Sequence, residues 1–240
     1  MLPILYQDQD IVVVNKRSGL LVHRSAIDTK AEEFAMQILR DQLGQRVYPV
    51  HRLDRPTSGA LLFALSSENA RELSLVFSEG RVSKTYLAVV RGNPPSEVLV
   101  DHPLKEELDE IADKKARVDK PAQPAVTKVF TLASVELPMQ VDKFPTARYS
   151  LVKAIPITGR KHQIRRHLRH LGHPIIGDVS HGSGKHNRFF RNQFQVNRLL
   201  LACTQISFLH PKENKMITVE APLAEEFKQI LHQLGWTHVV

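Results

Sequence analysis

The chain has 240 residues with 33 Lys and Arg against 25 Asp and Glu, so 33 − 25 gives a net charge of +8. Its 42% hydrophobic and 24% charged residues are typical of a globular protein and exclude a disordered, collagen-like or coiled-coil chain. The longest apolar run, Gly59 to Leu65, is far shorter than the roughly 20 residues of a membrane span, and early acidic residues argue against a secretion signal. The single cysteine, Cys203, excludes an intramolecular disulfide and a multi-cysteine zinc site, which favours a reducing, cytoplasmic setting.

Apolar periodicity predicts more strands than helices. Strands are expected at 11–14, 47–50, 59–65, 82–90, 126–135, 148–155, 199–208 and 216–219. Helices are expected at 31–43, 67–77 and 160–171, and in a last amphipathic stretch from Leu223 to Leu234. Because strands and helices do not alternate regularly, the predicted class is α+β, with a mixed, largely antiparallel sheet and flanking helices. No repeat or low-complexity linker divides the chain, so we expect one domain over 1–240.

Charge is distributed unevenly along the chain. The stretch from Gly159 to Arg191 contains eight Lys and Arg residues and a single acidic residue, Asp178. Six of the twelve histidines lie in the same stretch. Such a patch can neutralise several phosphates, which favours RNA or DNA as the ligand over an unliganded solvated face. By contrast, Lys105 to Lys120 holds six acids and five bases. It predicts a solvated helix or an ordered insertion, here placed at 105–125.

Several familiar motifs are absent. Gly177 and Gly182 have the spacing of a phosphate-binding loop, but Ser183 stands where that loop requires lysine. Histidines 162, 167, 170 and 173 do not share one helical face and lack a nearby carboxylate, so we expect surface or RNA-contacting histidines and no metal. No cofactor is expected.

The segment most suggestive of chemistry is His51-Arg52-Leu53-Asp54-Arg55-Pro56-Thr57-Ser58-Gly59. Two arginines flank one aspartate just before an apolar strand. On the residue types alone, Asp54 could equally form a surface ion pair or cap a turn.

This segment resembles the catalytic signature of the RluA-type pseudouridine synthases. Further stretches resemble the family's other motifs in order, at 14–23, 84–92, 158–165, 172–178 and 198–201 with His210-Pro211. Arg17, where the family usually has proline, and Ala202-Cys203, where it has His-Ala, depart from the pattern away from the catalytic positions. The resemblance implies the family's catalytic fold, with an active-site cleft across the sheet, and no small RNA-binding domain before Ile4.

The resemblance also implies roles for individual residues. Asp54 would be the catalytic carboxylate, Arg165 its ion-pair partner and Tyr86 an aromatic group that contacts the uracil. From the residues alone, Arg165 could instead be one more phosphate contact and Tyr86 a core tyrosine. Arg52 would fill the gap left by a flipped base. The full set of expected RNA-contacting residues is Arg52, Arg55, Lys84, Arg160, Lys161, His162, Gln163, Arg166 and Arg169.

Within the family, Glu106–Lys114 and Lys120–Thr127 resemble a subgroup that modifies uridine 65 of tRNA. We therefore expect a cytoplasmic enzyme that isomerises uridine in RNA, with tRNA as the first candidate substrate. We expect no membrane association and no obligate protein partner. A ribosomal RNA synthase of the same family, or a non-catalytic RNA-binding protein, is the alternative. Whether Asp54 attacks C6 or C1′, or abstracts the 2′ proton, stays open.

Overall fold

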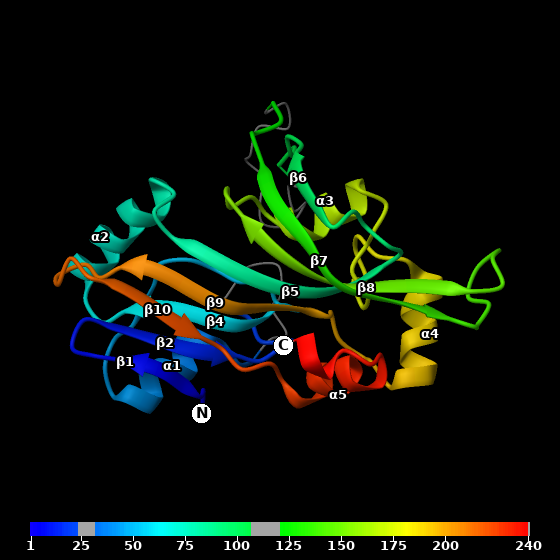
Figure 1. Ribbon diagram of the computed structural model, residues 1–240. Coiled ribbons are helices and arrows are strands. Elements are labelled where there is room, and N and C mark those ends of the chain that lie inside the picture. The colour runs from blue at the N-terminus through cyan, green and yellow to red at the C-terminus, as the bar shows by residue number, and fades with distance from the viewer. Residues whose placement is uncertain (24–31, 107–120, 240) are drawn as a thin grey trace. The chain divides into compact units, whose positions relative to one another are not determined.

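The computed structural model describes residues 1–23, 32–106 and 121–239 (Figure 1). Most of the expected insertion at 105–125 therefore lies outside the described residues. The chain divides into two compact units. The first comprises Met1–Lys84, Pro103–Pro124 and Thr204–Pro222, and the second Thr85–His102, Ala125–Cys203 and Leu223–Val240. A single domain over 1–240 stays a prediction.

The strands of the first unit are β1 (Ile4–Gln7), β2 (Ile11–Lys16), β3 (Tyr48–Pro49), β4 (Ser58–Ala64), most of β9 (Leu201–Leu209) and β10 (Met216–Glu220). Their order is β1-β2-β4-β9, with β3 on β4 and β10 on β9. β2 and β4 are antiparallel, from Ile11 opposite Ala64 to Lys16 opposite Gly59. Both strands are apolar and almost wholly buried, so they form the centre of this unit.

Two helices belong to the first unit, α1 (Ala35–Leu43) and α2 (Ser67–Ser78). Ser66 caps α2, because its side chain accepts a hydrogen bond from the backbone N–H of Asn69. Leu73 and Val76 are the buried apolar residues of α2, and Leu39 is that of α1 together with Ala35. Both helices therefore bury apolar residues in the unit's core, and both fall within or close to the helical ranges expected from the sequence.

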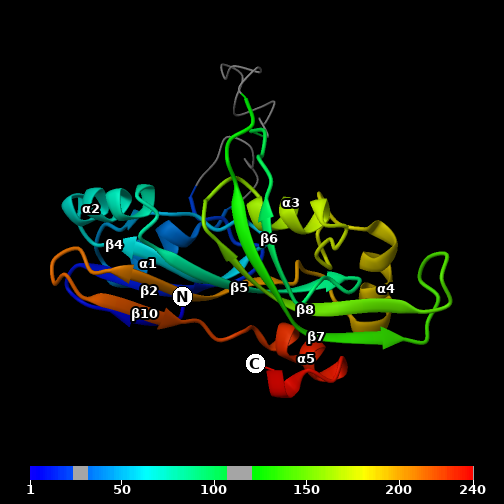
Figure 2. The same cartoon turned by 45° about the horizontal axis from the view of Figure 1, so that its top comes forward.

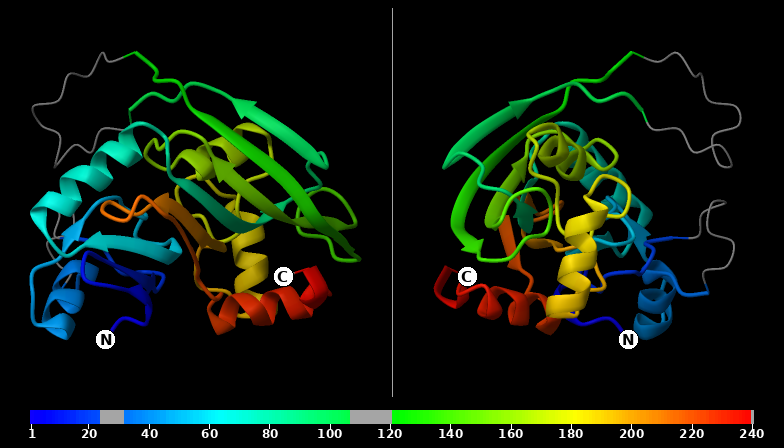
Figure 3. Two further views of the ribbon diagram at one scale, coloured as in Figure 1. Left: turned by 60° about the vertical axis from the view of Figure 1, so that its left-hand side comes forward. Right: turned by 90° about the vertical axis from the view of Figure 1, so that its right-hand side faces the viewer.

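The second unit contains most of β5 (Ser83–Arg91), together with β6 (Glu97–Asp101), β7 (Val126–Leu137) and β8 (Ala147–Pro156), in the order β5-β8-β7-β6. β5 pairs with β8, β8 with β7 and β7 with β6, each antiparallel. β7 and β8 run side by side to the hairpin that joins them (Figure 2). Its helices are α3 (Gln163–His170), α4 (Gly184–Phe194) and α5 (Glu225–Gln233), followed by a 3-10 turn (Thr237–Val239). Figure 3 shows α4 and α5 beside each other, and both contribute to one apolar core cluster.

The predicted class, mixed and largely antiparallel with flanking helices, is confirmed. Four elements were missed: β1, β6, α4 and the final 3-10 turn. α4 escaped prediction because only His186 and Phe190 are buried on it, so it lacks a wide apolar stripe. α3 begins at Gln163 rather than Arg160, since His162 before it has a left-handed backbone, with φ 55°. No helix in the described part of the chain is long and apolar enough to cross a membrane.

Candidate active site

Asp54 lies in the loop between β3 and β4, in the first unit. Leu53 and Thr57 are buried and fix the loop on both sides of it. The backbone N–H of Thr57 donates to the carbonyl of Asp54 at 3.0 Å, which closes a turn. Asp54 itself is half-buried, while Arg52 and Arg55 are exposed. The turn therefore presents one carboxylate between two exposed cationic side chains.

His51 fastens the start of this loop. Its Nε2 accepts the backbone N–H of Leu62 in β4 at 3.0 Å, and its ring stacks on Phe77 of α2 with centroids 5.0 Å apart. The Nζ of Lys84 lies 5.6 Å from the centroid of the same Phe77 ring. Burial, together with the positive charge of Lys84, lowers the pKa of His51 to about 3. His51 is thus a neutral acceptor, and the predicted RNA-contacting residue Lys84 lies close to it.

A buried lysine connects this loop to the segment after β2. The Lys16 side chain is fully buried, and its Nζ donates to the carbonyls of Leu20 at 2.7 Å and of Arg17 and Arg55 at 3.1 Å each. The two segments are also joined directly, because the backbone N–H of Gly19 donates to the Arg55 carbonyl at 2.9 Å. A buried ammonium is costly unless its N–H groups are satisfied, and three carbonyls satisfy them here. The buried ammonium of Lys16 therefore fixes the turn that carries Asp54, through its hydrogen bond to the Arg55 carbonyl.

In the second unit, Arg165 on α3 pairs with Asp178. The Arg165 Nε lies 2.7 Å from one carboxylate oxygen and Nη2 2.8 Å from the other, and the side chains are 4% and 0% exposed. Burial alone would raise the pKa of Asp178, but hydrogen bonds from Arg165 and from the backbone of Ser180 and His181 lower it below its usual value. Asp178 is therefore ionised. Arg165 is not one of the exposed phosphate contacts that its position in the basic stretch allowed.

Tyr86 also belongs to the second unit. It is buried in β5, opposite Ala154 of the antiparallel strand β8. Asp54 belongs to the first unit, whereas Tyr86 and Arg165 belong to the second. Each of the three predicted catalytic side chains is thus placed on a well-packed element, a turn, a strand and a helix respectively.

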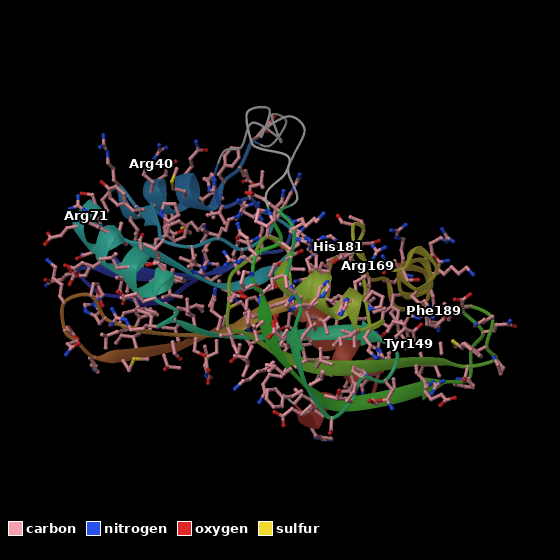
Figure 4. All side chains as sticks on the ribbon, turned by 90° about the horizontal axis from the view of Figure 1, so that it is seen from above. Arg40, Arg71, Tyr149, Arg169, His181 and Phe189 are labelled. Carbon is pink, nitrogen blue, oxygen red and sulfur yellow. The ribbon has the colours of Figure 1, made fainter. Side chains whose placement is uncertain are left out.

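Four of the predicted RNA-contacting bases lie on α3 or just before it. Arg160 and Arg169 are exposed, and Lys161 and Arg166 are partly exposed. Figure 4 labels Arg169 close to His181, and Arg169 Nη1 donates to the Ser180 carbonyl at 3.4 Å. Since Asp178 is neutralised by Arg165, the one acid between 159 and 191 does not offset the charge of these bases.

Two other predicted contacts have contrasting environments. The His162 Nδ1 lies 3.0 Å from the His181 Nε2, at the edge of the basic surface. Gln163 is buried, and the protein itself uses its amide group: Oε1 accepts from the Thr158 hydroxyl and the Arg160 backbone, while Nε2 donates to Val126 and Thr127. The placement of Gln163 favours a structural role over an RNA contact.

The expectation of surface histidines is wrong for His167. Its side chain is fully buried on α3 and hydrogen-bonded at both nitrogens, to the Thr127 hydroxyl and the His102 carbonyl. Ile164 and Leu168 are buried on the same helix, and His167 stands three residues after Ile164, the spacing of one helical face. The helical spacing therefore places His167 inward as well, although histidine is not usually a core residue.

Among the described residues, one group of ligand-type side chains has metal-site spacing: Asp8, Asp10 and His210. The His210 Nδ1 accepts two backbone N–H groups, so its Nε2 carries the proton and donates to Asp8 at 3.1 Å. An N–H group cannot ligate a cation, so this cluster serves to join two turns.

Sequence reasoning assigned no role to Asp178, Lys16 or Thr127. The sequence does offer one indication that Asp178 matters, because it is the sole acid in the strongly basic stretch 159–191. It offers none for Lys16, since a lysine at the end of an apolar strand is normally exposed.

Comparison with known proteins agrees with this geometry. The family model described as RNA pseudouridylate synthase matches residues 10–170. The tRNA pseudouridine synthase C of Vibrio cholerae is 52% identical, over 98% of this chain and 97% of its own length. The tRNA pseudouridine synthase C of Haemophilus influenzae is 50% identical, over 100% of both chains.

A solved structure, Human RNA Pseudouridylate Synthase Domain Containing 4, superposes with a TM-score of 0.75 at 27% identity, covering 97% of this chain and 93% of that one. The predicted signature at 51–59 falls inside the matched region, and there it forms the rigid turn that presents Asp54. The chain belongs to the RNA pseudouridylate synthase family.

Proposed function

We propose that this protein isomerises uridine to pseudouridine in tRNA, at uridine 65, with Asp54 as the catalytic carboxylate. The observation that carries the proposal is the turn at 54–57, which holds one half-buried carboxylate between buried anchors and beside exposed arginines. The full-length relatives named tRNA pseudouridine synthase C support tRNA as the substrate. We also infer a cytoplasmic location, because that compartment supplies a tRNA substrate.

The reaction breaks the N1–C1′ bond of uridine, forms a C5–C1′ bond, and moves the C5 proton to N1. It needs no electron acceptor, because atoms and electrons balance within the nucleotide. A carboxylate can act as the nucleophile or base beside the ribose and uracil. Asp54 is the group proposed for this step, and attack at C6, attack at C1′ and removal of the 2′ proton all agree with its placement.

Arg165 and Tyr86 are the proposed partners of that carboxylate. The Asp178 carboxylate binds the Arg165 guanidinium through Nε and Nη2 and so fixes its orientation. The charge of Arg165 would stabilise an ionised Asp54 in a water-poor site. The Tyr86 ring would stack on the uracil and its hydroxyl would help to remove the C5 proton.

The target base in a tRNA stem must leave the helical stack before it can react. Arg52 stands two residues before Asp54 and is exposed. We propose that its side chain enters the RNA helix and fills the space left by the flipped base. Phosphates of the same stem are assigned to the exposed or partly exposed bases and to one histidine, namely Arg55, Lys84, Arg160, Lys161, Arg166, Arg169 and His162.

Asp54→Asn tests the proposal directly. The variant should bind unmodified tRNA with nearly wild-type affinity and form no pseudouridine, because an amide is neither nucleophile nor base. Asp41→Asn, which removes an exposed carboxylate paired with Arg40, is the matched control and should keep full activity. Pseudouridine would be mapped by sequencing in tRNA and ribosomal RNA. Wild-type turnover by Asp54→Asn, or modification confined to ribosomal RNA, would overturn the proposal.

A further inference from the structure

A single buried hydroxyl fastens helix α3 to strand β7. Thr127 is fully buried in β7, and its Oγ1 lies 2.9 Å from the Gln163 Nε2 and 2.9 Å from the His167 Nδ1. Gln163 and His167 are four residues apart, so they project from one face of α3 in successive turns. The hydroxyl thus holds two points of the helix at once.

The direction of each hydrogen bond follows from the chemistry of the partners. The His102 carbonyl can only accept, so the His167 Nε2, 3.0 Å away, carries a proton and donates to it. The Nδ1 of a neutral imidazole then accepts from the Thr127 hydroxyl. The Thr127 oxygen in turn accepts from the Gln163 amide. Burial lowers the pKa of His167, which agrees with a neutral ring.

Further contacts fix the same helix at both ends. At its start, the amide oxygen of Gln163 accepts from the Thr158 hydroxyl and the Arg160 backbone, at 2.7 and 3.0 Å. At its end, the His170 ring stacks on the His102 ring with centroids 3.7 Å apart. The helix therefore cannot rotate or slide without breaking buried hydrogen bonds, each of which is expensive to leave unmade.

We propose that Thr127 is a positioning residue for the reaction: through Gln163 and His167 it sets the rotation and axial position of α3, and hence of the Arg165 guanidinium. This inference rests on the proposed function. Arg165 lies between the two anchored residues on α3, and each residue of a helix corresponds to about 100° of rotation and 1.5 Å of rise. A small shift of the anchored face therefore moves the guanidinium by a comparable distance.

The test compares two substitutions of Thr127, one that removes the Oγ1 hydroxyl and one that keeps it. Thr127→Val keeps the shape and removes the hydroxyl, and it should lower the single-turnover rate on tRNA by about 100-fold, the effect typical of a displacement near 1 Å. The Kd for tRNA should change less than about threefold, because the exposed bases are unaltered. Thr127→Ser restores the hydroxyl and should recover the rate. Thr131→Val, the same change on the same strand at a hydroxyl bonded to the Pro94 and Pro95 carbonyls, is the control and should react at the wild-type rate.

A second variant breaks the same contact from the helix. Gln163→Met should lower the rate at least as much, because it also removes the bonds of Gln163 to Val126, Thr158 and Arg160. Thr127→Val combined with Gln163→Met should lose less than the sum of the two single losses, because the two substitutions remove one shared hydrogen bond. Variants are compared at a temperature where their melting curves show them folded. A wild-type rate for Thr127→Val, an unrescued Thr127→Ser, or fully additive losses would each overturn the inference.

A measurement on the unaltered protein separates this inference from the proposed function. Nitrogen-15 NMR of the imidazole should show His167 as the neutral tautomer protonated at Nε2 at pH 7. Protonation at Nδ1 would overturn the hydrogen-bond chain whatever the activity. If the wild-type protein modifies no RNA, the proposed function fails; if it does and Thr127→Val is unimpaired, only the positioning role fails.

Discussion

Arg165 and Asp178 bind each other through both carboxylate oxygens in a pair that is almost wholly removed from solvent. Asp178 is held in turn by two backbone N–H groups, those of Ser180 and His181 at 3.0 and 2.9 Å. The carboxylate therefore ties the loop after α3 to the helix. It also fixes the plane of the guanidinium, because a bidentate pair allows one orientation only.

Asp178→Asn should destabilise the protein strongly. The substitution leaves a buried guanidinium without its counter-charge, and breaking such a pair costs about 3–5 kcal/mol. Urea unfolding monitored by circular dichroism gives the free energy of unfolding. Asp142→Asn, which removes a partly exposed partner of Lys185, is the control and should cost less than about 1 kcal/mol. Equal losses in the two variants would contradict a structural role for the pair.

Lys16→Met should weaken both stability and catalysis. The variant keeps most of the side-chain volume but removes the donors to the carbonyls of Arg17, Leu20 and Arg55. A buried carbonyl left without its donor costs about 1–3 kcal/mol, and the Arg55 carbonyl keeps the Gly19 N–H, so the carbonyls of Arg17 and Leu20 predict a loss of about 2–6 kcal/mol in unfolding free energy. The turnover rate should fall as well, since the turn of Asp54 is released. Lys228→Met, at an exposed lysine on α5, should behave as wild type; a similarly mild result for Lys16→Met would show that the turn is held by other contacts.

Much of this arrangement could be predicted from the sequence. The apolar runs that became β2 and β4, and the capped helix α2, follow from local patterns that tertiary contacts reinforce. The turn of Asp54 was identified through a motif, and its placement between buried residues agrees with that identification. The partners Asp178 for Arg165 and Thr127 for His167 could not be predicted, because those pairs are fixed by how α3 packs on the second unit and leave no periodic trace.

The salt dependence of RNA binding should report on the basic surface around α3. Arg166→Ala combined with Arg169→Ala should reduce the slope of log K against log salt by about 1.4–1.8, since each lost phosphate contact removes about 0.7–0.9. Filter binding of tRNA across a salt series measures it. Arg40→Ala combined with Arg81→Ala removes two arginines that pair with Asp41 and Glu79, and should leave the slope unchanged. An unaltered slope for the first pair would place the RNA on another surface.

Acid should destabilise the fold through buried histidines. Burial lowers the pKa of His186 to about 4, and Tyr149 lies 2.8 Å from its Nδ1. The unfolded state takes up a proton near pH 6.5 while the folded state does not, so stability is complete above pH 6.5 and falls as the pH drops toward 4. In His186→Asn the acid-induced loss of unfolding free energy should be smaller than in the wild type, by on the order of 3 kcal/mol. Urea unfolding between pH 8 and 4 measures it.

His232→Asn is the control for that experiment, because His232 is exposed on α5. It should retain the wild-type loss of stability in acid. If His186→Asn loses as much stability as wild type over the same range, the neutral state of His186 contributes nothing to acid sensitivity.

The Lys16 ammonium joins two segments that are far apart in the chain, and it does so from inside the molecule. Neither segment can open to solvent alone, because opening either one would strand a charge in the interior. The amide hydrogens of Gly19 and Thr57, both bonded within this assembly, should therefore exchange with deuterium at one common rate, that of unfolding the surrounding sheet. The position of the Asp54 carboxylate would then be as stable as the sheet on which its turn is packed.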